Sequence, residues 1–435
     1  MTSPAYEVYF ETLPGMTHCY EDEIANPKEA ALQLLNKMKF LDSLGIKQVV
    51  LPPQEHPYMP LLKRIGFEGT TKDKLTSLKK AAPWLIPQIC MSSNHRNATV
   101  CPSIDSANSH LHFTPANQAS SFMRSQDTEP TNRLLKALFK NPVFFEIHPP
   151  LPAVEFFYDE GAKNHFRFCK NYGSPGVQLF TFGKSYQPSL TPLPFPEKIA
   201  ARQSKEASEA ITRLHRTYPG HNVFAFQNPN AIDLGTSHSD LLAISNQNLL
   251  LIHSRALWKQ SDIIKQLKKL VADVSGTELT VIEITEKQLA LKAALESHFF
   301  NSQIITLSDN SMTLISSNTC KEFESGFLKE ILEDNDNPIG SIHFVDLSEI
   351  NKKGGGPAST CLQVVMNASE LSEISESVFF RESLYHQLVD HVNKSYPTSL
   401  SITDLSDPNL YLKFMDSLNE ICHILNLKGI YSFQH

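Results

Sequence analysis

Short apolar runs alternate with amphipathic stretches along all 435 residues, and this alternation constrains the fold more than any other feature. Brief apolar runs between turn residues are typical of buried strands, and apolar residues at every third or fourth position are typical of helices. The pattern predicts strands at 6–13, 48–51, 87–90, 110–113, 144–147, 177–182, 223–226, 241–245, 249–252, 281–284, 304–307, 312–315, 342–347 and 362–365. It predicts helices at 130–139, 203–215, 258–271, 287–299, 321–332, 381–396 and 410–425. A further helix is expected to begin at Asn26-Pro27, which suit an N-cap and a first turn, and to end at Gly45. We therefore predict an α/β fold.

Several predicted strands follow one another with no helix between them. Residues 241–245 and 249–252 flank Asn246-Gln247-Asn248, which suits a tight hairpin between antiparallel strands. Such pairs argue against a purely parallel sheet. No low-complexity segment divides the chain, so residues 1–435 are expected to form a single unit of repeated βα modules.

The composition excludes several classes of protein. Hydrophobic residues make up 41% and charged residues 20% of the chain, which is ordinary for a soluble globular protein. A net charge of −7 provides no basic footprint for nucleic acid or for an anionic membrane surface, so neither partner is expected. No run approaches the roughly 18 apolar residues of a membrane span.

Cysteine usage and the first residues indicate the compartment. The 7 cysteines are scattered, odd in number and without a CxxC pair, so neither a disulfide framework nor a zinc ribbon is expected. The opening sequence MTSPAYEVYFETLPG lacks the basic region and apolar core of a secretory signal. We expect a reduced, cytoplasmic protein.

Two polar segments carry residue types suited to acid–base chemistry. The segment from Asp159-Glu160 to His165 follows an apolar run, so its carboxylates are expected just past a strand, where working side chains are common. A solvated acidic turn is the alternative. His238 and Asp240 lie two positions apart in a predicted strand, so both would face one side and act as a general acid–base beside a cation-binding carboxylate. A loop histidine is the alternative there.

Three consecutive glycines, Gly354–Gly356, stand out in a chain with only 17. Glycines are costly to order and allow the backbone to approach a ligand closely. A nucleophile just after such a turn would be well exposed, and either Ser359 or Cys361 can be that group. A flexible hairpin tip is the alternative.

Isolated arginines and histidines give weaker signals. Arg124, Arg167 and Arg202 can each bind a carboxylate bidentately, although a single arginine is more often a surface charge. His110 and His112 would share one strand face as a metal pair. No third ligand occurs at a recognisable spacing, so no metal site is expected.

Taken in order, these segments resemble the N-succinylarginine dihydrolase family over nearly the whole chain. The motifs that carry the resemblance are Gly15-Met16-Thr17-His18, Val50-Leu51-Pro52-Pro53-Gln54-Glu55-His56-Pro57, Asp159-Glu160-Gly161-Ala162-Lys163-Asn164-His165, the segment from Ala201-Arg202-Gln203 to Ala210, Gln227-Asn228-Pro229, Phe300-Asn301-Ser302-Gln303, Gly354–Ala358 and Tyr431-Ser432-Phe433-Gln434. Each motif is weak alone, and their shared order makes the match specific.

The resemblance implies a fold and a reaction. The fold is a pentein, in which five ββαβ-type modules surround a pseudo-five-fold axis with the active site at the centre. The reaction converts N-succinylarginine and two waters to N-succinylornithine, two ammonia and carbon dioxide in cytoplasmic arginine degradation. The resemblance implies no metal and no organic cofactor, and it suggests a homodimer.

The resemblance also assigns roles to residues. The family's glutamate, which orients and charges a histidine, matches Glu160, and that histidine matches His238. The guanidinium-binding aspartate matches Asp240. The two substrate-binding arginines match Arg124 and Arg202.

The chain departs from the family at several matched positions. The family's nucleophilic cysteine falls at Ser359 in an alignment without gaps, and Cys361 lies two residues later. From Ser359 onward we expect a strand, which would place Cys361 on the same face but too far along to replace the nucleophile. The family's asparagine before the three glycines is Lys353, and a histidine before the binding arginine is Met123.

Two departures concern contacts with the substrate. Most of a substrate loop is missing after Tyr20, and a substrate-binding asparagine falls at Arg96, with Asn97 adjacent. A serine hydroxyl needs a stronger base than a thiol does. Two hypotheses therefore stay open: an active guanidine-group hydrolase, or a pentein that binds a ligand or partner without catalysis.

Overall fold

The computed structural model describes residues 4–19, 23–90, 97–187, 194–324, 326–334, 336–352 and 354–435. Its strands form five separate three-stranded sheets. In chain order they are β1 (Ala5–Thr12), β2 (Gln48–Leu51), β3 (Ala98–Cys101), β4 (Leu111–Pro115), β5 (Phe145–Ile147), β6 (His165–Phe168), β7 (Val177–Phe182), β8 (Asn222–Phe226), β9 (Ala243–Asn246), β10 (Leu249–His253), β11 (Thr280–Ile284), β12 (Gln303–Thr306), β13 (Met312–Ser317), β14 (Ile339–Val345) and β15 (Cys361–Asn367).

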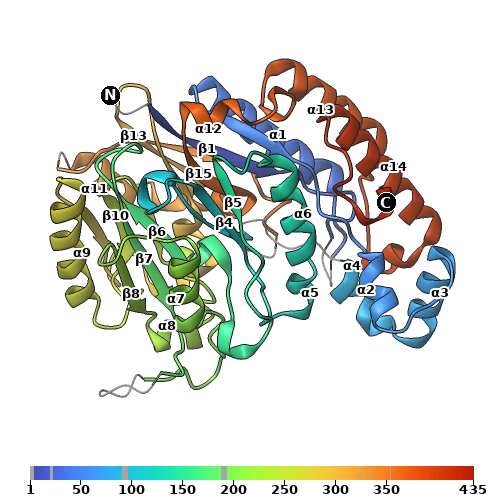
Figure 1. The fold of residues 1–435 in the computed structure, drawn as a ribbon, viewed down its shortest axis with the longest axis horizontal. Helices are drawn as coiled ribbons and strands as arrows, with labels where there is room; N and C mark the ends of the chain where they lie inside the picture. Colours follow the sequence, from blue (N-terminus) through green and yellow to red (C-terminus); the bar gives the residue numbers. More distant parts are fainter. Residues whose placement is uncertain are drawn as a thin grey trace.

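Helices lie mainly on the outside of these sheets (Figure 1). They are α1 (Pro27–Ser43), α2 (Met59–Arg64), α3 (Thr71–Ala81), α4 (Ile86–Cys90), α5 (Phe122–Ser125), α6 (Thr128–Leu138), α7 (Lys205–Leu214), α8 (Pro229–Asp233), α9 (Gln260–Ser275), α10 (Leu291–Ser297), α11 (Phe327–Glu333), α12 (Ala368–Ser372), α13 (Glu382–Ser395) and α14 (Pro408–Ile424). Helix α1 begins as predicted, because the side chain of Asn26 accepts a hydrogen bond from the Glu29 amide at 3.1 Å.

One pairing rule repeats in all five sheets. The middle strand runs antiparallel to the strand before it and parallel to the strand after it, as β4 does with β3 and β5. A helix connects the two parallel strands, as a parallel crossover requires. Each sheet with its helix is therefore one ββαβ module. The predicted pentein arrangement of five modules is confirmed by this topology.

The fifth module joins distant parts of the sequence. Strand β15 pairs antiparallel with β1, from Ala5 opposite Asn367 to Glu11 opposite Cys361, and β1 pairs in parallel with β2. The pairing closes the ring and brings the segment just before β15 next to the N-terminal strand. Helices α13 and α14 continue from this module; α13 packs against α1, and α14 packs against α13 (Figure 1).

Most predicted strands and helices are present within a few residues, and the exceptions have local causes. The predicted strand 87–90 is wrong, because these residues belong to α4; a short apolar run cannot be distinguished from a buried helical turn by periodicity. Strands β3 and β6 and helix α3 were not predicted. In α3 only Leu75 and Leu78 are buried, so its apolar stripe is narrow.

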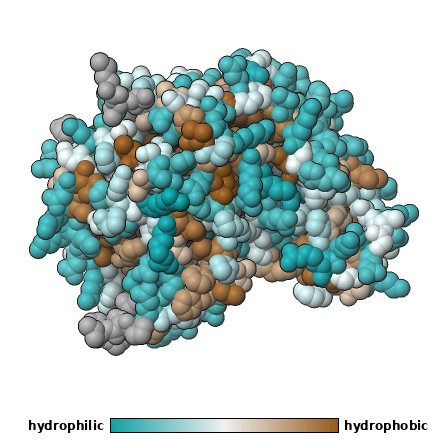
Figure 2. All heavy atoms as spheres, viewed as in Figure 1, coloured by the Kyte–Doolittle hydropathy of each residue, from teal (hydrophilic) through white to brown (hydrophobic). Residues whose placement is uncertain are grey.

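The surface in Figure 2 is mainly hydrophilic, with separate hydrophobic patches and no continuous apolar belt on the face shown. In the part of the chain that the structure describes, no helix combines the length and the apolar character needed to cross a lipid bilayer.

Candidate active site

Four short 3₁₀ turns occupy the same place in four modules, directly before or close to the module's first strand. They are η4 (Gly161–Asn164) before β6, η5 (Ser239–Leu241) before β9, η6 (Phe299–Asn301) before β12 and η8 (Pro357–Thr360) before β15. Neighbouring turns contact one another in the order η4, η5, η6, η8. Since the modules surround one axis, equivalent positions meet at one end of the ring, and residues far apart in sequence become neighbours.

Four of the predicted site residues lie on or directly before these turns and not on strands, whereas Arg124 lies in α5 and Arg202 in the loop before α7. Glu160 directly precedes η4, and His238 directly precedes η5, which contains Asp240. Ser359 lies inside η8, and β15 begins only at Cys361. The predicted strand spacings for His238 and Asp240, and for Ser359 and Cys361, are therefore wrong. Serine and aspartate side chains bond to nearby backbone, which favours turns over strand ladders at such places.

Glu160 is held by four partners in a fully buried position. Its Oε2 faces His238 Nε2 at 2.9 Å, and its Oε1 accepts a hydrogen bond from Ser120 Oγ at 2.7 Å. The guanidinium of Arg124 donates to both carboxylate oxygens. The backbone amide of Glu160 donates to Gln203 Oε1 at 2.8 Å. A solvated acidic turn is thus excluded here.

The charge states of Glu160 and His238 follow from burial and from their contact. Burial raises the pKa of Glu160, but the hydrogen bond and charge of His238, together with Arg124, outweigh burial and hold that pKa well below its usual range. Burial lowers the pKa of His238, and the hydrogen bond to Glu160 opposes this shift. At neutral pH an ionised carboxylate therefore accepts Nε2–H of a neutral imidazole. The other ring nitrogen, Nδ1, lies 2.9 Å from Ser237 Oγ and carries the lone pair that can accept a proton.

Asn301 connects the turn of Asp240 with the glycine segment. Its Nδ2 donates to Asp240 Oδ2 at 3.2 Å, and its Oδ1 accepts from the Gly356 amide at 2.7 Å. Asn164 joins the two preceding turns in the same way, since its Oδ1 accepts from the Ser239 amide at 3.0 Å. Side-chain amides thus fix the turns relative to one another.

The three glycines are required by geometry. Gly354 and Gly355 have φ angles of 113° and 119°, in the left-handed region that favours glycine. A side chain on Gly356 would collide with the backbone oxygen of Asn301. The segment is therefore tightly packed, and the alternative of a flexible hairpin tip is wrong. It leads to Ser359, which is 5% exposed and whose hydroxyl donates to the Gly356 carbonyl at 2.7 Å.

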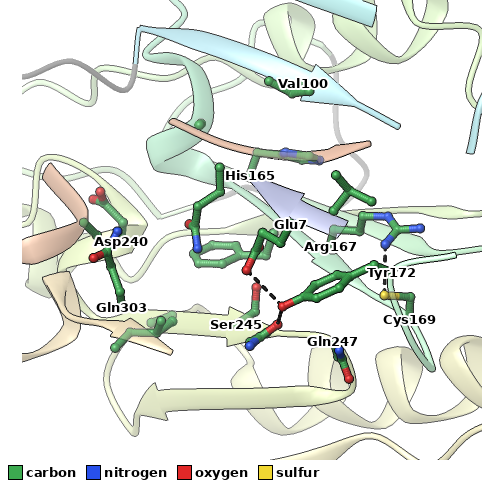
Figure 3. A pocket seen from close by; sticks show the side chains of 18 of the residues that line it. Glu7, Val100, His165, Arg167, Cys169, Tyr172, Asp240, Ser245, Gln247 and Gln303 are labelled. Atoms are coloured by element: carbon green, nitrogen blue, oxygen red, sulfur yellow. Dashed lines mark hydrogen bonds between the residues drawn. The ribbon is translucent and has the colours of Figure 1, made fainter. Parts of the chain in front are cut away.

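A central cavity ends at the same turns. It is lined by residues of the first strand of every module, β3, β6, β9, β12 and β15, and of β1. At the turns it is lined by Ala162, Asp240, Phe300 and Ala358. Figure 3 shows Asp240 on one side of this cavity and Glu7 and Tyr172, hydrogen-bonded at 3.0 Å, on the other. Of the residues to which the family resemblance assigns a role, Asp240 alone is among the described residues that line it; the candidate residues Arg167 and His165 line it as well.

The three arginines have different surroundings. Arg124 is committed to Glu160 and to Ser120 Oγ. Arg167 pairs with Asp105 at 2.5 and 3.1 Å and also donates to the Ser174 carbonyl, so its charge serves the packing of the modules.

Arg202 lies near Arg124 and Glu160 and is partly buried. Burial lowers its pKa, and the charge of Arg124 adds to that effect. Within the described parts of the chain its guanidinium has neither a hydrogen bond nor an ion pair. It is therefore available for an anionic group of a ligand.

Cys361 does not take the place of Ser359 within η8. It is 1% exposed, begins β15 and lies opposite Glu11. Cys361 lies near the hydroxyl of Tyr9. Burial is the largest cause of the raised pKa of Tyr9, the charge of Glu7 comes next, and Cys361 has the smallest effect. All seven cysteines are buried, and none of them forms a disulfide bond.

Three positions at which the chain departs from the family pattern, Tyr20, Arg96 and Lys353, lie outside the described residues. Ser120, Gln203 and Asn301 are contacts of the site that we did not predict. Gln203 and Asn301 lie within matched motifs, so their amides were a usable signal. Ser120 had none, because its contact with Glu160 depends on how the segment before α5 folds back.

Comparisons with known proteins agree with this arrangement. The family model for succinylarginine dihydrolase matches residues 10–434. An N-succinylarginine dihydrolase of Marinobacter nauticus is 39% identical over the full length of both chains. A second, from Photorhabdus laumondii, is 38% identical over 99% of each chain. Among solved structures, an arginine dihydrolase from the ornithine–ammonia cycle of cyanobacteria matches 86% of this chain and 42% of that chain, with 14% identity and a TM-score of 0.46, which is too low to bear on function.

Proposed function

The chain belongs to the succinylarginine dihydrolase family, and on that premise we propose that it converts N-succinylarginine and two waters to N-succinylornithine, two ammonia and carbon dioxide. The observation that carries the proposal is the buried contact of Glu160 with His238, at 2.9 Å, within a chain that matches the family from end to end. Hydrolysis needs only substrate and water, so the proposal includes no cofactor.

His238 is the proposed general acid and base. Glu160 accepts from its Nε2–H, which fixes the ring and leaves Nδ1 as the nitrogen that exchanges protons. The ionised carboxylate also stabilises the imidazolium that forms when Nδ1 takes a proton. Arg124 and Ser120 hold Glu160 in this orientation.

Asp240 and Arg202 are the proposed binding groups for the two ends of the substrate. Asp240 lines the central cavity and can pair with a guanidinium, which presents a planar set of donors. Arg202, whose guanidinium has no partner among the residues that the structure describes, suits a carboxylate of the succinyl group. The role of Arg124 in substrate binding stays a prediction, because in this structure its guanidinium contacts Glu160.

Ser359 is the proposed nucleophile. Its Oγ attacks the guanidinium carbon, His238 takes the hydroxyl proton and delivers it to the departing nitrogen, and ammonia leaves. Water then cleaves the O-linked isouronium and restores the serine, leaving a ureido group. A second cycle releases the second ammonia, and the remaining carbamate decomposes to carbon dioxide and the ornithine amine, which balances two waters.

Paired variants test the roles of Glu160 and His238. Glu160→Gln and His238→Gln retain hydrogen-bonding groups of similar size but remove the carboxylate charge or the titratable ring. Each should lower the rate of ammonia release from N-succinylarginine by roughly 100-fold or more, the usual contribution of a general acid–base. Glu155→Gln is the matched control, since Glu155 is exposed and pairs with Lys184.

Unchanged turnover in both variants would reject the assignment. Absence of turnover in the unmodified protein, with N-succinylarginine still bound, would favour a non-catalytic binding protein. We also propose a cytoplasmic homodimer, as the family resemblance suggests; light scattering during size-exclusion chromatography tests the dimer.

A further inference from the structure

Two histidines and a glutamate meet on the sheet of the second module, away from the catalytic turns. His112 lies in β4, Glu146 lies opposite it in β5, and His148 follows directly after β5. One nitrogen or oxygen from each side chain lies within 4.8 Å of the other two. The sequence showed His112 without a third ligand, because its partners come from a neighbouring strand and not from a local spacing.

The distances in this cluster fit a small tetrahedral ion. His112 Nδ1 lies 3.7 Å from Glu146 Oε2, and His148 Nδ1 lies 3.9 Å from Glu146 Oε1. Bonds of roughly 2.0–2.1 Å to a tetrahedral Zn²⁺ place ligand atoms about 3.3 Å apart. The planes of the two imidazole rings are parallel within 4°, with His112 Nδ1 and His148 Nε2 in a 2.8 Å hydrogen bond. Breaking this hydrogen bond by a small rotation of one ring would free the Nδ1 of His112 for a cation, with the Nδ1 of His148 as the second nitrogen ligand.

Asn108 orients two of the three side chains. Its Oδ1 lies 2.8 Å from His112 Nε2, and because an amide oxygen only accepts, that nitrogen carries the proton. The lone pair of His112 is therefore on Nδ1, on the side of His148 and Glu146. The Nδ2 of Asn108 donates to Glu146 Oε2 at 3.0 Å. An outer partner that fixes both a histidine tautomer and a carboxylate is typical of metal sites.

Burial and charge favour binding, with one opposing group. Both imidazoles are buried, with His112 0% and His148 7% exposed, so the cluster is largely shielded from bulk water. The side chain of Glu146 is 35% exposed, which leaves a route for an ion and room for a water ligand. The positive charge of Arg216 acts on both histidines and weakens cation binding.

We propose that His112, His148 and Glu146 form a binding site for one divalent transition-metal ion of the zinc class, with water as the fourth ligand. The site lies near the start of β4. The other end of β4 leads to Asn117, whose Oδ1 accepts a hydrogen bond from the amide of Asp159 at 3.2 Å, next to the catalytic turns. The proposed metal site and the catalytic turns are therefore roughly 16 Å apart along this segment. A bound ion would tie β4 to β5 and stabilise this module without entering the reaction.

Metal titration of the full-length protein tests the site. After treatment with a chelator, the protein is titrated with Zn²⁺ by calorimetry and with Co²⁺ while the visible spectrum is recorded. We expect one equivalent of each metal to bind, the absorption of tetrahedral Co²⁺ to appear, and the melting temperature to rise with Zn²⁺. None of these signals depends on ammonia release, so they succeed or fail separately from the proposed function.

Four variants assign the ligands. Glu146→Gln retains the shape of a partly exposed side chain and should weaken Zn²⁺ binding at least tenfold, and Asn108→Ala should weaken it about 10- to 100-fold through loss of orientation. His110→Gln is the matched control, because the Nδ1 of His110 contacts the Asn108 backbone oxygen at 2.9 Å. Arg216→Gln should tighten binding.

Two results would overturn the proposal. One is the absence of a stoichiometric site in the unmodified protein. The other is equal weakening by His110→Gln and Glu146→Gln, which would indicate adventitious binding by surface histidines.

Discussion

The turn that carries Ser359 is hydrogen-bonded to a buried ion pair. Breaking that pair gives a sharp test of the structure. Lys37 Nζ in α1 donates to Glu11 Oε1 and to the Pro357 carbonyl, both at 2.7 Å. Thr360 Oγ1 donates to Glu11 Oε2 at 2.9 Å. Both charged side chains are 0% exposed. The pair thus connects α1, β1 and η8.

Lys37→Met should destabilise the protein strongly, because it removes one charge and leaves the other. The Glu11 carboxylate would remain fully buried without a counter-ion, and the Pro357 carbonyl would lose its donor. Loss of one partner of a buried pair costs about 3–5 kcal/mol in free energy of unfolding. Adding Glu11→Gln removes the uncompensated charge, so the double variant should recover about half or more of that loss.

Urea unfolding followed by tryptophan fluorescence and circular dichroism measures these changes. Lys39→Met is the matched control on the same helix, since Lys39 pairs with Glu382 at the surface, with 46% and 56% of their side chains exposed. It should leave the unfolding midpoint nearly unchanged. The reasoning fails if Lys37→Met is as stable as the control, or if the double variant is no more stable than Lys37→Met.

Three other predictions concern the site. Ser359→Cys should raise ammonia release from N-succinylarginine by about tenfold or more at saturating substrate, because a thiolate forms more readily than an alkoxide. Cys361→Ala is the control for this variant. A loss of activity in Cys361→Ala alone would identify Cys361 as the nucleophile. Arg202→Met should raise KM by about 10- to 150-fold, the equivalent of a charged hydrogen bond of about 1.5–3 kcal/mol, whereas Arg213→Met, on the exposed side of α7, should not; equal KM values would remove Arg202 from the binding site. Burial raises the pKa of Asp159 from 3.8 to about 7, so the neutral acid stabilises the fold fully below pH 4 and this stabilisation is lost as pH rises through 7. At about 1.4 kcal/mol per pH unit the loss reaches about 4 kcal/mol at most, and Asp159→Asn should abolish this part of the pH dependence in urea titrations; an unchanged slope would refute the assignment.

The fold was largely predictable because its modules repeat simple patterns. The hairpin around Asn246-Gln247-Asn248 is formed by β9 and β10, and the cap at Asn26 begins α1. The closure of the ring by β15 and β1 was not visible in the residues themselves, because nothing local in the two strands marks them as partners. The family resemblance predicted five modules around one axis but did not name these two strands as partners.

Two elements, β6 and α3, were not predicted although the sequence carries a local pattern for each, because a second feature obscured that pattern. Strand β6 alternates polar and apolar residues from His165 to Phe168, but the polar motif directly before it hides this short alternation. The capping box of Thr70 and Asp73 was present in the sequence, yet the helix that it begins buries little apolar surface.

The roles assigned to the site residues stay predictions, and the local geometry expected around them was wrong. The sequence identified Glu160, His238 and Asp240, and the structure brings Glu160 into contact with His238 through turns that were expected to be strands. The partners of Glu160 and the availability of the Arg202 guanidinium depend on tertiary packing. They could not be inferred from residue spacing.

The central claim is that this chain hydrolyses the guanidinium of N-succinylarginine. The most direct measurement quantifies ammonia and N-succinylornithine from N-succinylarginine in the presence of the purified protein, with His238→Gln alongside. The account predicts two ammonia per N-succinylornithine formed, and at least a 100-fold slower release with His238→Gln. Binding of N-succinylarginine with no ammonia above the buffer background would contradict it.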